Sequence, residues 1–210
     1  MIRKFFFILI LFLLVGQQAM AIDEPKYNLE KKEGNIEIRH YSDSVVAEVK
    51  VQGTREEAVS IAFRILFNFI SGNNLVQKEI KMTAPVSQQK SSEKIPMTSP
   101  VTQHKNDTNN WTVAFYMPSD MTYEKTPKPK DSRIQIKKIT GDKVAVIKFS
   151  GFHSDSNFSN HEKKLKQYLD ERGYKYKSVP TLAYYDPPFT PWFLRRNEVM
   201  YTLVSGSTIH

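Results

Sequence analysis

The stretch that decides the fold runs from Ile36 to Asn74 and reads IEIRHYSDSVVAEVKVQGTREEAVSIAFRILFNFISGNN. Its first part, from Ile36 to Val51, alternates apolar and polar residues and is rich in Val and Ile. This pattern predicts two β-strands separated by a turn at Ser42–Ser44. After Gly53 the apolar residues follow the period of a helix instead. The stretch therefore predicts a strand-strand-helix unit, which is typical of an α+β fold.

The predicted helix has a recognisable beginning and end. Thr54 and Glu57 form a capping-box pattern, in which the hydroxyl and the carboxylate satisfy free backbone N–H groups of the first turn. Gly72 can take the left-handed conformation that ends a helix. The helix is therefore expected from Arg55 to Ile70. Its sheet-facing side is expected to consist of Ala58, Ile61, Ala62, Ile65, Leu66 and Phe69.

Two phenylalanines fall outside that sheet-facing side. On a helical wheel, Phe63 lies at its edge and Phe67 lies among the polar residues. The helix thus carries more apolar surface than one contact with a sheet requires. Two interpretations stay open from the pattern alone: a loop covers Phe63 and Phe67, or a flat apolar ligand lies against them.

The second half of the chain repeats the pattern of the first at a distance of 98 residues. Val46-Ala47 corresponds to Val144-Ala145, and Gly53 corresponds to Gly151. In each half a strand ends at the glycine and an amphipathic helix follows, the second of them predicted over Asn157–Arg172. Further strands are expected over Trp111–Met117, Arg133–Ile139, Lys143–Phe149, Thr181–Tyr185 and Asn197–Val204. Two related strand-strand-helix-strand halves would form an antiparallel sheet with two helices.

The first 21 residues have the layout of a secretory signal peptide. Arg3 and Lys4 precede an uninterrupted apolar run, Phe5–Val15, and Ala19–Ala21 has the small-residue pattern of a cleavage site. The apolar run is short for a membrane-spanning helix, which needs about 20 residues. We expect cleavage before Ile22 and a single mature domain over residues 22–210, periplasmic or secreted if the host is bacterial. The alternative is an uncleaved N-terminal anchor.

Composition excludes several kinds of chemistry. The chain has no cysteine, so disulfides, thiolate nucleophiles and thiolate-bound metals are excluded. Its 30 Lys and Arg against 22 Asp and Glu give a formal net charge of +8, which favours anionic partners. Export argues against nucleic acid as that partner, and no stable membrane span is expected once the leader is removed.

No catalytic pattern stands out, so the sequence favours a binding protein over an enzyme. A Gly-x-Ser-x-Gly elbow, a phosphate-binding glycine loop and a His-Glu-x-x-His helix are all missing from the sequence. His153, Asp155, His161 and Glu162 are close in sequence and are the alternative candidates for a metal site. Their spacing does not match a helical chelate.

Six short motifs carry a resemblance to a known family, and two of them nearly repeat one pentapeptide, MTAPV and MTSPV. The motifs are IEIRHY at 36–41, ISGNN at 70–74, KMTAPV at 81–86, MTSPV at 97–101, YDPPFTP at 185–191 and RRNEV at 195–199. In this order they resemble the SOUL family of haem-binding proteins over almost the whole mature chain. Pro85 and Pro100 cannot donate to a β-ladder, so each pentapeptide is expected at a strand end or edge, with Met82 and Met97 near the pocket.

The resemblance implies a fold and a ligand. The family's fold is a distorted antiparallel β-barrel of two pseudo-repeated halves, each with one α-helix, in agreement with the 98-residue repeat. Its members bind haem or other tetrapyrroles in a shallow apolar groove along the first helix. Carried onto this chain, the ligand-facing residues are Ser60, Phe63, Arg64, Phe67 and Asn68. Some members are basic at positions 60 and 68, so here Arg64 is the expected partner of the haem propionates.

The resemblance also points to His40 as a ligand of the haem iron, because some members have been proposed to use the histidine of this motif. The main hypothesis is thus an exported, non-enzymatic binder of haem or related tetrapyrroles, with reversible binding. One alternative is a binding module for other amphiphilic small molecules, such as lipids or drug-like effectors, since bacterial effector-binding domains share the two-half fold. The other alternative is an enzyme that acts on such a ligand.

Overall fold

The structure is a computed structural model that describes residues 24–75, 101–105, 110–186 and 189–204. The predicted leader and the predicted strand ends at Met82–Val86 and Met97–Pro100 lie outside the described residues. The helices are α2 (Arg55–Ile70), α3 (Asp155–Glu171) and a 3₁₀ turn, η1 (Trp192–Leu194). The strands of the first half are β1 (Tyr27–Glu33), β2 (Ile36–Tyr41), β3 (Ser44–Gln52) and β4 (Asn74–Leu75). Those that follow are β5 (Val101–Lys105), β6 (Asn110–Tyr116), β7 (Lys128–Pro129), β8 (Gln135–Ile139), β9 (Lys143–Phe149), β10 (Thr181–Tyr184) and β11 (Asn197–Thr202).

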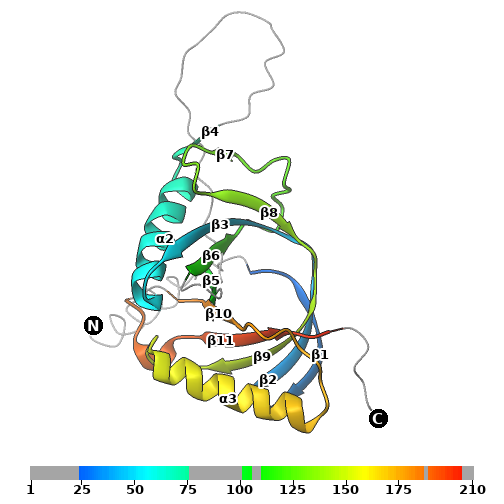
Figure 1. The fold of residues 1–210 in the computed structure, drawn as a ribbon. Coiled ribbons are helices and arrows are strands. Elements are labelled where there is room, and N and C mark those ends of the chain that lie inside the picture. The colour runs from blue at the N-terminus through cyan, green and yellow to red at the C-terminus, as the bar shows by residue number, and fades with distance from the viewer. Residues whose placement is uncertain (1–23, 76–100, 106–109, 187–188, 205–210) are drawn as a thin grey trace, which may run out of the picture.

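Nine of these strands form one antiparallel sheet, in the order β1-β2-β9-β11-β10-β5-β6-β3-β8. Figure 1 shows this sheet strongly curved, with α2 along one side and α3 along another. β4 and β7 form a separate two-stranded sheet. The α+β class with antiparallel sheet and two helices is confirmed. Among the described residues β1 and β8 are edge strands and no ladder joins them, so closure into a barrel stays a prediction.

Both helices pack on the same face of the sheet. Pairing runs across the sheet from Leu182 to Gln103 and from Gln103 to Val113, and residues opposite one another in a ladder share a face. Leu182 belongs to the core under α3, and Val113 belongs to the core under α2. The other face carries a smaller apolar cluster of Val144, Val146, Ala183 and Met200.

The 98-residue repeat is visible in the backbone. Gly53 and Gly151 both have positive φ, 129° and 116°, a region that side chains rarely enter. Each glycine follows a long strand, β3 or β9, and precedes a helix. The capping box is confirmed: the Thr54 hydroxyl accepts from the Glu57 N–H, and the Glu57 carboxylate accepts from the Thr54 N–H.

Two local predictions were wrong, and one strand was missed. α3 begins at Asp155 rather than Asn157, because the Ser154 side chain caps it by accepting from the Asn157 N–H. Ile61 is exposed rather than sheet-facing, since Ala58 and Ala62 already fill that contact. β1 was not predicted as a strand: its mostly charged, exposed sequence lacks alternation and is typical of a solvated edge.

Candidate ligand-binding surfaces

The exposed face of α2 brings together five of the residues that the sequence nominated. Ser60, Arg64, Phe67 and Asn68 are exposed on it, and Phe63 is partly buried at its edge. We call these five residues the α2 surface. The sequence periodicity placed them on one face, and the structure confirms that placement.

Two aromatic rings lie parallel on the α2 surface. The rings of Phe63 and Phe67 have centroids 5.8 Å apart and planes inclined by 10°. Phe63 also packs edge-on against Phe115 of β6, with centroids 5.4 Å apart, which ties it to the core. Phe67 is 47% exposed, so no loop within the described residues encloses it. The Phe63 ring, held by the core, and the exposed Phe67 ring together offer a flat apolar platform.

Arg64 is the positively charged residue of the α2 surface, and its guanidinium is available to a ligand. Among the described residues, Arg64 makes no hydrogen bond or ion pair that would hold its guanidinium. Glu57, one turn before Ser60 and two turns before Arg64, is engaged at the helix start, where hydrogen bonds from the Thr54 backbone and side chain lower the pKa of its carboxyl. Arg64 can therefore bind a carboxylate beside the aromatic platform.

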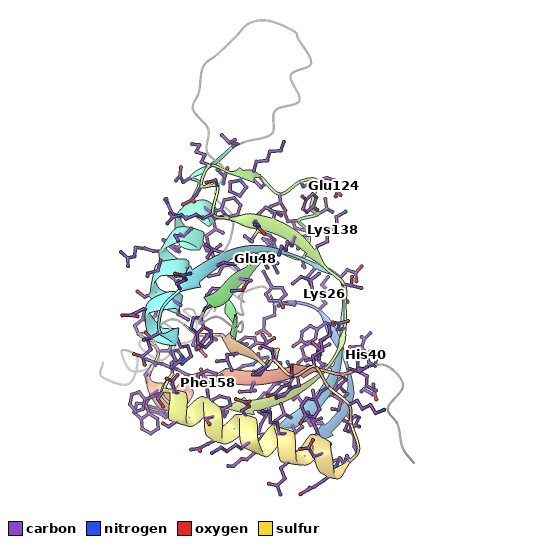
Figure 2. The ribbon with its side chains drawn as sticks, viewed as in Figure 1. Lys26, His40, Glu48, Glu124, Lys138 and Phe158 are labelled. Carbon is purple, nitrogen blue, oxygen red and sulfur yellow. The ribbon has the colours of Figure 1, made fainter. Side chains whose placement is uncertain are left out.

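His40 lies elsewhere. It is on β2, and its Nε2 lies 2.6 Å from the Glu30 Oε2 on β1, while the Lys143 Nζ lies 2.6 Å from the other Glu30 oxygen. Because side chains alternate along a strand, His40 lies on the same face of β2 as Ile36 and Ile38. Its own side chain is nevertheless exposed. Figure 2 shows His40 on the opposite side of the molecule from α2. The structure thus does not bring His40 together with the α2 surface.

A cleft of about 550 Å³ opens away from α2. Four segments line it: the residues Glu24–Lys26 before β1, the turn Ser42–Val45, the segment around Met121 and the end of β8 at Lys138–Thr140. Figure 2 shows Lys26, Glu124 and Lys138 along this side. Sequence reasoning missed the cleft because its walls come from four separate parts of the chain.

The cleft combines an apolar lining with charges at its rim. Met117, Met121 and Tyr116 contribute apolar surface, and burial raises the pKa of the Tyr116 hydroxyl to about 12, so it stays neutral. At the rim the Lys138 Nζ lies 2.8 Å from the Glu124 Oε1, and that hydrogen bond lowers the pKa of Glu124 to about 2. Such a site suits an amphiphilic small molecule.

An ion network lies buried on the sheet face that α2 and α3 leave uncovered. The Arg39 Nη1 and Nη2 each donate to Glu198 over 2.9 Å, although the two residues are 159 positions apart. Arg196 and Tyr185 also donate to Glu198, over 2.8 Å and 2.7 Å. Burial alone would raise the pKa of Glu198, but the Arg39 hydrogen bonds and the two positive charges outweigh it and lower that pKa. Glu198 is therefore an ionised, fully buried carboxylate.

The alternative metal site finds no support in the described residues, where no three His, Asp or Glu side chains gather in a metal-binding group. Asp155 instead accepts from the Arg55 guanidinium. His161 stacks on Phe149 with ring centroids 3.9 Å apart, and Glu162 accepts from the Tyr201 hydroxyl. Within the described residues, no helix has the length and apolar character needed to cross a membrane.

Comparison with known protein families and relatives gives a consistent match. The family model described as "SOUL heme-binding protein" matches residues 22–202. Heme-binding protein 2 of Mus musculus is 26% identical over 196 residues, which cover 87% of this chain and 91% of the relative. Heme-binding protein 2 of Homo sapiens is also 26% identical, over 193 residues that cover 86% and 89% of the two chains.

Solved structures with a similar fold are more distant in sequence. The C-terminal domain of EcmrR superposes with a TM-score of 0.57 at 10% identity, covering 87% of this chain and 99% of that domain. A structure described as a hydrolase from Listeria innocua superposes with a TM-score of 0.51 at 14% identity, covering 83% and 94%. At these identities the likeness concerns the fold alone.

Proposed function

Because the chain belongs to the SOUL family of haem-binding proteins, we propose that it is a non-enzymatic binder that holds haem or a related tetrapyrrole reversibly against the α2 surface. The observation that carries this proposal is the parallel pair of Phe63 and half-exposed Phe67. A flat macrocycle can lie on these rings and bury apolar area that is otherwise left in water. Arg64 is placed to pair with a propionate carboxylate.

The α2 surface offers no axial ligand for iron. Its five residues are Ser, Phe, Arg, Phe and Asn, none of which is a usual haem ligand. Binding there would depend on stacking and on the propionates, which haem and metal-free protoporphyrin share. We therefore expect the α2 surface to bind both with similar affinity.

Replacing Phe63 and Phe67 together by alanine is expected to weaken tetrapyrrole binding at least tenfold, or about 1.4 kcal/mol. The reason is the lost apolar contact, since burial is worth roughly 25 cal/mol per Å² before the costs of association. Absorbance titrations with haemin and with protoporphyrin measure the effect. Circular dichroism checks that the variant is folded.

A variant of the cleft serves as the matched comparison in this titration. Met121→Ala with Tyr123→Ala removes a similar amount of apolar side chain from the cleft and leaves the five residues of the α2 surface in place. If the cleft variant loses affinity and the phenylalanine variant does not, the tetrapyrrole is held in the cleft and the α2 proposal fails.

The cleft also favours a second candidate function, the binding of other amphiphilic small molecules. Its volume of about 550 Å³ falls within the range of roughly 300–1,000 Å³ common for ligand pockets. Among the described residues, the Lys26 ammonium lines it without an ion-pair partner, next to an apolar wall. A fluorescent fatty acid that binds wild type and is lost in the cleft variant would support this function.

Replacing His40 by alanine is expected to leave both the haem affinity and the Soret band unchanged. The imidazole pairs with Glu30 on the side of the molecule away from α2, so it does not reach a macrocycle held on the α2 surface. Parallel titrations with haemin and protoporphyrin test this expectation. A loss confined to haemin would instead establish His40 as the iron ligand.

We also propose that the protein is exported and processed. The basic start, the apolar run Phe5–Val15 and the Ala19–Ala21 pattern support a signal peptide. Mass spectrometry of the exported fraction is expected to show a chain that begins at Ile22. An intact Met1 on a membrane-bound chain would show that the segment is an anchor.

A further inference from the structure

Five large apolar side chains project into solvent at one corner of the molecule, apart from the cleft and the α2 surface. These residues, which we call the aromatic corner, are between 49% and 85% exposed: Phe152, Phe189, Trp192, Phe193 and Leu194. The rings of Phe152 and Trp192 stack with centroids 5.4 Å apart, and Phe193 packs edge-on against Trp192. Exposed apolar groups gathered in this way mark interaction surfaces.

The aromatic corner is held in place by its own hydrogen bonds. The Gly151 N–H donates to the Trp192 carbonyl over 2.9 Å, which ties the loop before α3 to η1. The buried Asn197 side chain donates to the Gly151 carbonyl over 3.2 Å, and the Leu194 N–H closes η1 on the Pro191 carbonyl. The rings therefore point outward from an ordered scaffold, so little ordering entropy would be lost on docking.

The chemistry of the aromatic corner suits the interface of a lipid bilayer. The segment Phe189–Leu194 reads FTPWFL and carries no charge, and Arg195 follows it directly. Trp and Phe beside a basic residue are typical of chain that lies at the boundary between lipid headgroups and acyl chains. Side chains as exposed as Phe189 and Leu194 protrude from the surface, which fits insertion into a soft phase.

The first residue of the described chain, Glu24, contacts the strand start that follows the aromatic corner in sequence. The Arg196 Nη1 donates to both carboxylate oxygens of Glu24, over 3.0 and 3.1 Å, and Arg196 lies only two residues after Leu194. Chain preceding Glu24 includes the apolar run Phe5–Val15, whose proposed role is to engage a membrane during export. The Arg196–Glu24 contact therefore links the start of the described chain to the residues that directly follow the aromatic corner.

We propose that the aromatic corner docks the protein on an anionic membrane by inserting Trp192, Phe193 and Leu194 into the bilayer interface. Without the leader, which contains Arg3 and Lys4, the chain keeps 28 Lys and Arg against 22 Asp and Glu, and this formal net charge of +6 adds a long-range attraction to anionic headgroups. This docking is peripheral and independent of tetrapyrrole binding. Docking also sets the orientation of the protein on the membrane. The start of α2 lies beside the aromatic corner, because Arg55 donates to the carbonyl of His153, next to Phe152. The first turn of α2 thus lies near the membrane surface.

Intrinsic fluorescence reports this insertion directly. The chain has two tryptophans, and Trp111 is buried with its Nε1 donating to the Gly53 carbonyl, so an environmental change on docking comes from Trp192. The protein is expressed from its whole sequence, and its N-terminus is determined by mass spectrometry. Vesicles of phosphatidylcholine with phosphatidylglycerol are expected to shift the emission to the blue and to carry the protein down on sedimentation. Trp192→Phe should abolish the shift and keep most of the sedimentation.

The deciding variant is Phe193→Ser with Leu194→Ser, compared with wild type carrying the same N-terminus. It is expected to lower the vesicle-bound to free ratio at least about tenfold, because two apolar side chains no longer leave water. Leu29→Ser with Val179→Ser is the matched control, since both residues are exposed apolar side chains outside the aromatic corner. The control pair is expected to bind like wild type.

Four results would overturn the proposal. The first is wild type that neither sediments with vesicles nor shifts its emission. The second is an equal loss in the control pair. The third is vesicle binding that salt abolishes and that never shifts Trp192 emission, which means adsorption by charge alone. The fourth is a dimer in sedimentation velocity that the Phe193 and Leu194 variant dissociates while vesicles have no effect, because the aromatic corner would then contact a second copy of the chain.

Discussion

Replacing Phe69 by alanine is expected to lower the free energy of unfolding by about 3–5 kcal/mol, the range for truncating a buried phenylalanine. Phe69 is 1% exposed and lies in the core between α2 and the sheet, among Leu66, Val113 and Phe115. Truncation removes the ring from this packing and leaves a cavity that the surrounding β-strands cannot fill. Urea denaturation followed by circular dichroism measures the change.

Phe67→Ala is the matched comparison on the same helix. The ring lies two residues before Phe69 but is 47% exposed, so its loss is expected to cost less than about 1 kcal/mol of stability. The two variants should therefore separate stability from binding, with Phe69→Ala affecting mainly the first and Phe67→Ala mainly the second. If Phe67→Ala destabilises as strongly as Phe69→Ala, the Phe67 ring is covered in solution and the α2 surface is not available to a ligand.

Replacing Glu198 by glutamine is expected to cost about 3–5 kcal/mol, the range for breaking a buried ion pair. Glu198 is fully buried and accepts from Arg39, Arg196 and Tyr185. Glutamine keeps the shape of the side chain but removes the negative charge. Among the described residues, the fully buried guanidinium of Arg39 then keeps only the Glu37 carboxylate as a countercharge.

The cost of this substitution should depend on pH. The pKa of Glu198 in the folded protein lies below its ordinary value of 4.5, so its ionised form stabilises the fold above that value. The stabilisation is lost as the pH falls from that value through the lowered pKa, because over this range the unfolded state binds the proton before the folded state does. Unfolding curves of wild type and Glu198→Gln are expected to differ fully at neutral pH and to converge under acidic conditions.

An exposed pair serves as the control for the buried one. Glu124 and Lys138 form a contact of 2.8 Å at the surface, where solvent screens the charges. Glu124→Gln is expected to change the free energy of unfolding by less than about 1 kcal/mol. An effect of Glu198→Gln no larger than that of Glu124→Gln would mean that the buried network contributes little beyond its hydrogen bonds.

Local features were predictable because their causes lie within a few residues of one another. The Thr54–Glu57 capping box spans one turn, and the glycine after β3 or β9 is needed where the backbone takes a positive φ. The shared face of Phe63 and Phe67 also follows from the period of a single helix. By itself the sequence therefore determined the two helices, most of the β-strands, the antiparallel α+β class and the residues of the α2 surface.

Tertiary structure alone decided which surfaces meet. Alternation placed His40 with Ile36 and Ile38, but only the position of β2 shows that this end of the strand faces water and lies away from α2. The Arg39–Glu198 pair joins residues 159 positions apart, and the cleft is assembled from four separate segments. The physical reason is that periodicity states which side chains share a face, whereas the partner of that face depends on strand order. Strand order is set by contacts between segments that are distant in the chain.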